Sequence, residues 1–360
     1  MLSGKWSGQW SSTTRRKRHP RHTDLVGLRF PAMALIRDGP SDDHSPLHHK
    51  IPSKPNAITL SIFCKIDILN KMSPYTLGII ASVVALISWG IGDFLIQKSV
   101  RRLGDWEPLF IISLFGAIIL SPFVWHDLGP ILISSSFFLL LAIGATFLFA
   151  SLFQFEGYKR GKLAVVEPIE ILEIPIAGTL AFFFLQEKPE TLTILLVFIL
   201  LCGLVLVSLK PHHLSKKSWL EKGVAFALAA SFFMGITNFL VAYSSRLTNP
   251  LLVVWFFDIF IASVAFVYLV LNKRLKPFFN DLRANPTLIT AVCILDNTAW
   301  ACFAFACSVI PLIIALALSE SYIALACVLG IFFNRESLTR YQFLGLIIAI
   351  PSAIAIAILA

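Results

Sequence analysis

The chain has 360 residues, of which 57% are hydrophobic and 14% are charged, and its mean hydropathy is +0.78. An ordinary soluble domain has about 45–50% apolar and about 25% charged residues, so this composition excludes a soluble globular protein and predicts a membrane protein. The net charge of +9 would suggest nucleic-acid binding in a soluble protein, but the basic residues lie in a tail and in short loops, so we expect no nucleic-acid partner.

The first 71 residues differ in composition from the rest of the chain. They contain 12 Lys or Arg, five Asp and five His, mixed with Ser and Pro, and no apolar run of membrane length. Such a segment cannot bury enough apolar surface to fold, so we expect residues 1–71 to be a largely disordered basic extension. Because Met72 directly precedes the first long apolar run, the sequence also allows a start at Met72 and a tail that is not native.

Ten apolar segments follow this tail. A helix needs about 20 predominantly apolar residues to cross the hydrocarbon core of a bilayer. The sequence therefore predicts an all-α polytopic membrane protein with ten transmembrane helices and short polar connections, at residues 76–96, 107–125, 131–153, 163–185, 192–209, 224–243, 251–271, 287–307, 312–333 and 341–359.

The distribution of basic residues predicts the orientation of these helices. The loops after the first, third, fifth, seventh and ninth segments contain 16 Lys or Arg, whereas the other loops contain only Lys188 and Arg246. Loops rich in Lys and Arg stay in the cytoplasm, so we expect both ends of the ten-helix core to lie outside. The 12 basic residues of the tail disagree with this orientation, because they would have to cross the membrane.

The two halves of the ten-helix core repeat each other. The first segment contains GIGDFLI and the sixth contains GITNFLV, an offset of 145 residues that aligns Asp93 with Asn238. FFLQEKPET and FFNRESLTR follow the fourth and ninth segments and align Glu187 with Glu336, an offset of 149 residues. Each half holds five segments, and an odd number makes the second half enter the membrane from the opposite side. The sequence therefore predicts an inverted repeat, an architecture that places the substrate between the halves.

Two features resemble the drug/metabolite transporter superfamily, in particular its ten-span EamA-type members. One is the polar-glycine cluster late in the first segment and repeated in the sixth, and the other is the apolar segment that ends in a Phe-rich stretch with a glutamate before a final helix that contains glycine. The resemblance covers about residues 74–360. It implies two EamA-like five-helix repeats, at residues 72–210 and 211–360, arranged as an inverted pair around a central cavity. It also implies transport of amino acids, sugars, nucleotides and their derivatives, or drugs, often by export or exchange. It assigns no substrate to numbered residues.

Three glutamates interrupt the fourth apolar segment, in the stretch VVEPIEILEIP. An ionised carboxylate at the centre of a membrane helix costs about 2.5–3.5 kcal/mol or more, so such residues are expected to face a cavity or a partner. Glu167, Glu170 and Glu173 would lie within an arc of about 120° on one helix face. Glu167 precedes Pro168 near three basic residues, which favours a structural role at a helix start. Glu170 and Glu173 are candidates for substrate or proton handling, and for Glu170 a buried hydrogen-bonding role is equally open.

Polar residues in other apolar segments extend this candidate site. Glu320 aligns with Ile171 of the fourth segment, so it is expected at a similar depth in the other half. The further candidates for substrate or proton handling are Asp258, Asp296 and Asn297, and the expected cavity lining includes Asp93, Asn238, Trp89 and Trp300. The aspartates could instead fix helix packing by hydrogen bonds. The two tryptophans could stack on an aromatic or cationic ligand, and Trp89 could equally be a packing contact.

The apolar segments hold several acidic residues and almost no Lys or Arg, so their cavity suits a proton or a cationic or zwitterionic molecule. We predict a secondary active transporter of a small metabolite, such as an amino acid, a sugar, a nucleotide-like compound or a drug. It would work by alternating access, with proton coupling through the membrane carboxylates. We expect a multi-pass protein of a bacterial-type inner (plasma) membrane that acts as a monomer or homodimer in the lipid bilayer. No catalytic residue, metal site or cofactor is expected, since the six cysteines have no C-x-x-C spacing.

Two alternatives to a transporter stay open. A channel or receptor-like membrane protein would share the apolar segments, although a repeat-built cavity disfavours it. An intramembrane aspartyl protease of the GxGD type is suggested by GIGD at the end of the first segment, with Asp93 and Asp258 as its aspartate pair. That family also has a Tyr-Asp helix before the GxGD helix and a Pro-Ala-Leu motif, and neither is present in this sequence. We expect the chain not to be an enzyme.

Overall fold

The computed structural model describes residues 72–129, 136–160, 169–208, 222–325, 328 and 339–359. The chain divides into two units, Met1–Ile51 and Pro52–Ala360, and all described residues belong to the second. The predictions for residues 1–71 lie outside the described residues.

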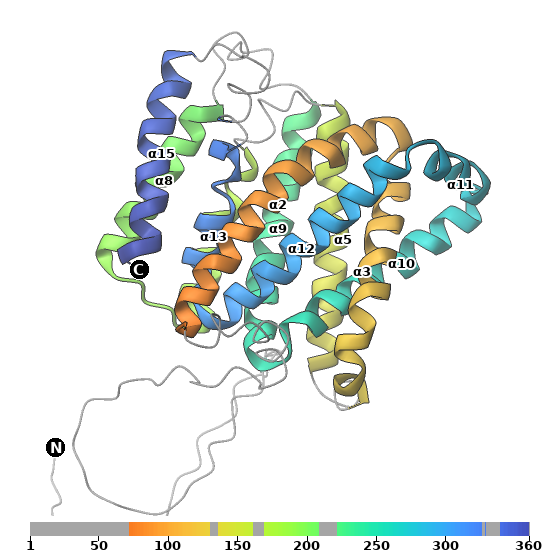
Figure 1. The fold of residues 1–360 in the computed structure, drawn as a ribbon, viewed down its shortest axis with the longest axis horizontal. Coiled ribbons are helices and arrows are strands. Elements are labelled where there is room, and N and C mark those ends of the chain that lie inside the picture. The colour runs from red at the N-terminus through yellow and green to blue at the C-terminus, as the bar shows by residue number, and fades with distance from the viewer. Residues whose placement is uncertain are drawn as a thin grey trace, which may run out of the picture. The chain divides into compact units, whose positions relative to one another are not determined.

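Apart from short turns and connections, the described residues form helices (Figure 1). In chain order these are α2 (Pro74–Leu103), α3 (Trp106–Val124), η2 (Trp125–Asp127), α5 (Ser136–Arg160), α7 (Glu173–Leu180), η3 (Ala181–Leu185), α8 (Thr191–Ser208), α9 (Lys222–Leu247), α10 (Pro250–Leu271), α11 (Leu275–Ala284), α12 (Pro286–Val309), α13 (Leu312–Ser319) and α15 (Arg340–Leu359).

Local sequence signals set several of these helix boundaries. Ser73 caps α2, because its Oγ accepts a hydrogen bond from the Thr76 backbone N–H at 3.1 Å. Asn249 caps α10 in the same way, with its Oδ1 3.0 Å from the Leu251 N–H. A proline follows each cap at the first helical position, where its missing N–H costs nothing. Gly104 ends α2 with a φ of 99°, a conformation that glycine adopts without strain.

Within the described part of the chain, eight helices are long and apolar enough to cross a membrane, by length and composition. They occupy eight of the ten predicted segments. At the fourth and ninth predicted segments, the described residues instead form shorter apolar helices, Glu173–Leu185 and Leu312–Leu325. The predicted count of ten spans is therefore not confirmed at these two equivalent places, where part of each predicted segment lies outside the described residues. The loop predicted after the seventh segment contains a further helix, α11.

The break in the fourth segment has a cause in its sequence. Pro175 has no N–H to donate to the carbonyl of Ile171 four residues earlier, and the Ile174 N–H takes that carbonyl at 3.1 Å. In the ninth segment, the Ser321 hydroxyl takes the Ala317 carbonyl at 2.8 Å, the carbonyl to which a helical Ser321 N–H would donate.

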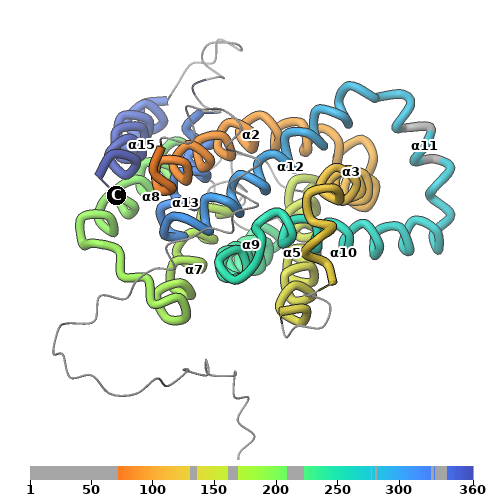
Figure 2. The backbone as a smooth tube through the Cα atoms, turned by 60° about the horizontal axis from the view of Figure 1, so that its bottom comes forward, coloured from red at the N-terminus to blue at the C-terminus, as the bar shows by residue number. Residues whose placement is uncertain are grey.

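Each helix contact between the two halves has a counterpart formed by the equivalent helices. α2 packs on α12, and α5 packs on α9; α7 packs on α9, and α13 packs on α2. Figures 1 and 2 show α3 beside α10, and α8 beside α15 at one side of the bundle. Under the sequence offset, α2 corresponds to α9, α5 to α12 and α7 to α13, so each of these contacts has its counterpart.

Polar contacts define two opposite ends of the bundle. At one, the Arg101 end, the last turns of α2, α5 and α10 meet the first turns of α3 and α12. Contacts there join Arg102 to Asn285 at 3.0 Å, Lys159 to Asp105 at 2.6 Å, and Arg274 to Glu107 at 2.7 Å. At the other, the Arg246 end, the last turns of α3, α9 and α12 meet the starts of α10 and α13. Asn249 donates there to Asp127 at 2.8 Å.

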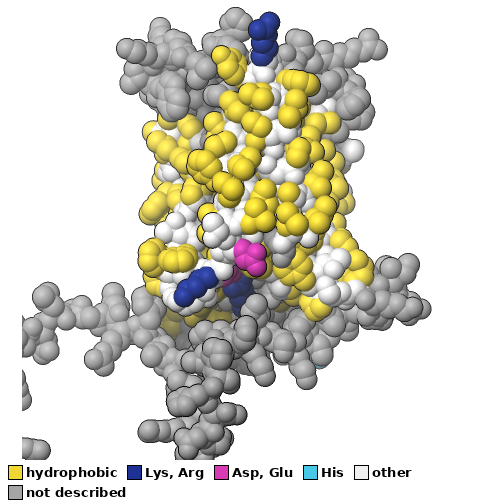
Figure 3. Space-filling model, turned by 90° about the vertical axis from the view of Figure 1, so that its left-hand side faces the viewer, with side chains coloured by type: hydrophobic (Ala, Val, Ile, Leu, Met, Phe, Trp, Pro, Cys, Tyr) yellow, Lys and Arg dark blue, Asp and Glu magenta, His cyan; other side chains and the backbone are white. Residues whose placement is uncertain are grey.

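The face that carries α8 and α15 is covered by hydrophobic side chains between charged groups near its two ends (Figure 3). The exposed residues on it include Leu192, Ile194, Leu195, Phe198, Phe343, Leu344, Ile347, Ile350 and Ile354. A surface this apolar would be unfavourable in water and matches the hydrocarbon of a bilayer. The chain is a multi-pass integral membrane protein.

Candidate functional site

A cavity with about 760 Å³ of empty space, counting the part open to solvent, lies among the helices. Its nineteen lining residues come from α2, α3, α5, α7, α9, α10 and α12 and from the two breaks; none comes from α8 or α15. Nine of the ten candidate residues predicted from the sequence are among them: Trp89, Asp93, Glu170, Glu173, Asn238, Asp258, Asp296, Trp300 and Glu320. The tenth, Asn297, lies outside the lining and donates to the backbone carbonyls of Ile112 and Cys293 at 3.1 and 2.9 Å.

Both breaks place a glutamate in this cavity. The chain turns at Ile171 and Leu172 before α7 begins at Glu173, and it turns at Glu320 and Ser321 after α13 ends. The Leu172 N–H donates to the Ile169 carbonyl at 3.0 Å, and the Ser321 N–H donates to the Leu318 carbonyl at 3.2 Å. These two tight bonds are 149 residues apart, the offset of the second repeated motif.

The carboxyl groups of Glu173 and Glu320 hydrogen-bond to each other. Both residues are buried, with 7% and 8% of their surface exposed. An ionised carboxylate only accepts hydrogen bonds, so this contact requires a proton on one of the two groups. The pair is therefore a place where the protein can hold one proton between its two halves.

Glu170 lies beside this pair in a network with α5. The Tyr158 hydroxyl donates to Glu170 Oε2 at 3.1 Å, and Gln154 Nε2 lies 3.4 Å from the same oxygen. Gln154 also donates to the Tyr158 hydroxyl at 3.1 Å. These contacts support the buried hydrogen-bonding role for Glu170 that the sequence left open. The i, i+4 spacing of Gln154 and Tyr158 on one helix face is the only sequence signal for them.

The aspartates have partners of their own. Tyr322 donates a hydrogen bond to Asp93, and Ser113 donates to Asp258. Asp296 lies near enough to both aspartates to repel their charges. The sequence analysis missed Ser113 and Tyr322, and the offset of 149 that aligns Tyr322 with Glu173 could have indicated the latter.

Glycines let other helices approach these polar groups. A Cβ at Gly116 in α3 would coincide with the side-chain oxygens of Asn297 and Asp258. A Cβ at Gly235 in α9 would lie 3.1 Å from the Glu173 carbonyl, and one at Gly90 in α2 would lie 3.7 Å from the Tyr322 carbonyl. The repeated glycines therefore bring the first helix of each half against the break in the other half.

Aromatic rings form the apolar part of the wall. Trp89 and Trp300 pack edge to face, with ring centroids 5.3 Å apart, and Phe147 lies 4.7 Å from Trp300. Phe155 and Tyr322 also line the cavity. Aromatic faces attract cations, so this wall and the carboxyl groups favour the same kind of ligand.

Two glutamates named in the sequence analysis, Glu167 and Glu336, lie outside the described residues. In the part of the chain that the structure describes, no group of three or more His, Cys, Asp or Glu side chains is arranged to hold a metal ion.

Comparisons with known proteins agree with this architecture. The model of the EamA-like transporter family matches the chain twice, at residues 76–209 and 221–358. A solved structure described only as "Crystal structure of protein" aligns with a TM-score of 0.61 and 12% sequence identity, over 78% of this chain and 96% of its own. At that identity the likeness concerns the fold alone. A search of curated proteins gives no match.

Proposed function

The chain belongs to the EamA-like transporter family, and we propose that it moves a small cationic or zwitterionic metabolite by alternating access, exchanging it for a proton held by Glu173 and Glu320. The observation that carries this proposal is the charge of the cavity. Six of the nineteen lining residues that the structure describes are Asp or Glu, and none of these nineteen is Lys, Arg or His. A cargo with a positive group offsets this charge, whereas a phosphate or a simple carboxylate would find no cationic partner among the described lining residues.

Alternating access follows from an inverted relationship between the halves. Arg101 and Arg246 occupy equivalent positions near the ends of α2 and α9, yet they lie at opposite ends of the bundle. Equivalent helices that run in opposite directions support an inverted pair of repeats, at residues 72–210 and 211–360. Transporters built in this way can open to either side by rocking one repeat against the other around a fixed site.

The proton role rests on the position of the pair. Glu173 belongs to the first half and Glu320 to the second, so a movement between the halves would change the contact between their carboxyl groups. A cationic cargo that reaches the pair would compete with the shared proton. Proton release on one side would then be linked to cargo binding from that side.

The basic loops orient the proposed cycle. The Arg101 end carries Lys98, Arg101, Arg102, Lys159, Arg160, Lys273 and Arg274, so we place it in the cytoplasm. A bacterial-type inner membrane remains our proposal for the location.

These contacts give less support to the alternative function, an intramembrane aspartyl protease. Asp93 bonds to Tyr322 and Asp258 bonds to Ser113, whereas a catalytic aspartate pair would share a proton directly. The family consists of transporters.

A ligand screen tests the proposed cargo class. The full chain would be purified in detergent and its thermal unfolding followed with choline, putrescine, L-lysine, L-phenylalanine, glucose, succinate and uridine monophosphate. A ligand at 100 times its dissociation constant stabilises the native state by about 2.7 kcal/mol. We expect stabilisation by positively charged or zwitterionic probes, weakened in Glu173→Gln. Stabilisation by succinate or the nucleotide alone would contradict the proposal.

A further inference from the structure

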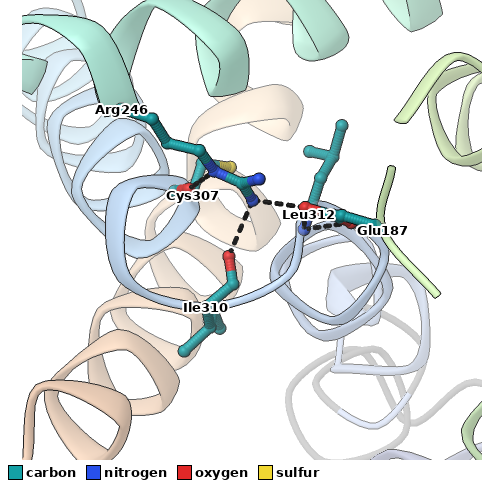
Figure 4. Close-up of polar contacts among 5 residues, drawn as sticks. All are labelled: Glu187, Arg246, Cys307, Ile310 and Leu312. Carbon is teal, nitrogen blue, oxygen red and sulfur yellow. Dashed lines mark hydrogen bonds and ion pairs between the residues drawn. The ribbon is translucent and has the colours of Figure 1, made fainter. Parts of the chain in front are cut away.

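An ion pair ties three segments together at the Arg246 end (Figure 4). Arg246, in the last turn of α9, donates from Nε to the Cys307 carbonyl at 2.9 Å and from Nη2 to the Ile310 carbonyl at 3.2 Å. The same Nη2 pairs with Glu187 Oε1. Both Glu187 oxygens lie 3.0 Å from the Leu312 backbone N–H, at the start of α13.

These contacts are well shielded from solvent. The Glu187 side chain is 10% exposed and the Arg246 side chain is 23% exposed. Hydrogen bonds in which both groups are charged are stronger than neutral ones, and shielding limits the competition from water. Glu187 also places a negative charge at the positive end of α13. The cluster therefore joins the first half of the chain, through Glu187, to two helices of the second half.

The described lining of the cavity includes no residue of this cluster. In α2 its lining residues are Trp89, Asp93 and Ile96, in the half of the helix nearer the Arg101 end. The lining residues of α3 lie in its first half, and those of α5 run from its middle towards its end, which again are the parts nearer the Arg101 end. Asn238 of α9 and Asp258 of α10 lie in the halves nearer the Arg246 end. At the Arg246 end, α2 and the end of α12 are in close contact, since a Cβ at Gly78 would lie 2.8 Å from Val309 and 2.7 Å from Ile310.

The equivalent contact at the Arg101 end is weaker. Arg101 donates to the Tyr158 carbonyl at 3.4 and 3.3 Å, and Tyr158 aligns with Cys307 at the offset of 149. Arg101 is exposed, whereas Arg246 is half-buried. The Tyr158 hydroxyl also donates to Glu170 in the cavity, so this end is connected to the site.

We infer that Glu187, Arg246 and the Leu312 N–H form a gate that closes the cavity at the Arg246 end. The inference rests on the proposed alternating access and adds the step that limits it on one side. Opening this end requires Arg246 to leave Glu187 and the α12–α13 connection, which separates α9 from the start of α13. Because the two ends open in turn, breaking the gate would favour the state that is open at the Arg246 end and closed at the Arg101 end.

Hydrogen–deuterium exchange on the full chain in lipid nanodiscs tests the gate. Glu187→Gln keeps an oxygen that can accept from the Leu312 N–H and removes the ion pair with Arg246. Glu190→Gln makes the same chemical change at an exposed position three residues later and is the matched control. Loss of a charged hydrogen bond changes an opening equilibrium by roughly tenfold or more.

We expect amides at residues 244–250 and 308–314 to exchange roughly tenfold faster in Glu187→Gln, and amides at residues 99–105 to exchange more slowly. The control is expected to match the wild type at both ends. Unchanged exchange, or faster exchange at both ends, would overturn the gate and leave only a structural contact. In parallel with the exchange experiment, uptake of choline and L-lysine is measured in proteoliposomes that contain the wild-type protein. Absence of uptake would count against the proposed function, whereas uptake without the reciprocal exchange pattern would count against the gate alone.

Discussion

Glu173 and Glu320 lie beside equivalent breaks in two helices, and their buried carboxyl groups hydrogen-bond to each other. One residue comes from each half of the chain, so the contact reports the relative position of the halves. A carboxyl pair of this kind needs a proton to remain in contact. It therefore links protonation of the site to the arrangement of the helices.

Replacing either member of the pair is expected to uncouple protons from cargo. Glu173→Gln and Glu320→Gln keep a hydrogen-bonding side chain but cannot release a proton. We expect proton movement driven by cargo to fall to background in both variants, with cargo binding retained in at least one. In free energy of unfolding, the double variant should lose less than the sum of the losses of the two single variants, because groups in direct contact are coupled by about 0.5–3 kcal/mol. Strictly additive losses would indicate that the two residues act separately.

Gly116→Ala is expected to destabilise the protein. The new methyl group would overlap the side-chain oxygens of Asn297 and Asp258, and overpacking of this kind costs about 1–3 kcal/mol. Gly129→Ala is the matched control, because a Cβ there has nothing within 4 Å. Thermal unfolding followed by tryptophan fluorescence should show a lower midpoint for Gly116→Ala alone. Equal midpoints would mean that α3 can move away from α10 and α12.

The equivalent glycines Gly90 and Gly235 are expected to differ in how well they tolerate substitution by alanine. A Cβ at Gly235 would lie 2.7 and 2.8 Å from atoms of the Ile176 side chain, whereas the nearest atoms to a Cβ at Gly90 are 3.4 Å away. Gly235→Ala should therefore lower both the unfolding midpoint and cargo affinity, because it pushes α9 away from the break at Glu173. Gly90→Ala should remain close to wild type. The opposite order in a paired thermal-shift and binding measurement would contradict this packing.

Asp105 is expected to make stability depend on pH. It lies between α2 and α3, where burial raises its pKa above the ordinary value and the hydrogen bond and charge of Lys159 oppose that rise. A carboxyl group with a raised pKa contributes most stability below its unfolded pKa of about 3.9 and loses that contribution as the pH rises through the folded value. The unfolding midpoint of the wild type relative to Asp105→Asn should therefore fall from pH 3.5 towards pH 7. If the unfolding midpoint of the wild type instead rose with pH relative to that of Asp105→Asn, the ion pair with Lys159 would outweigh the effect of burial.

Much of the candidate site could be predicted from single residues. A carboxylate in an apolar segment has few acceptable places, so the sequence alone could place Glu170, Glu173, Asp258 and Glu320 in one cavity. All four line the cavity in the structure, and their roles in transport stay predictions. Asn297 shows the limit of this reasoning, because an amide can also satisfy its hydrogen bonds on nearby carbonyls.

The breaks and the gate were harder to predict. Pro175 indicated a weak point in the fourth segment, but a kinked helix was as consistent with it as a turn. Ser321 gave no clear signal, because serine is common in membrane helices. Glu187 and Arg246 are 59 residues apart. The sequence repeat aligns Glu187 with Glu336 and, at the offset of 145, Arg246 with Arg101, so it gives no indication that Glu187 and Arg246 meet. Contacts between the halves depend on how the helices pack, which the hydrophobic pattern does not specify.

The most direct measurement is proton flux in proteoliposomes that contain the full chain and a trapped pH-sensitive dye. A gradient of choline, which carries no titratable proton, or of another probe that stabilises the protein would be imposed at equal pH on both sides. We predict that the probe moves down its gradient and drives protons the opposite way in the wild type, and that Glu173→Gln abolishes the proton movement. Proton movement that is unchanged in Glu173→Gln, or probe movement without protons in the wild type, would contradict exchange through the Glu173 and Glu320 pair.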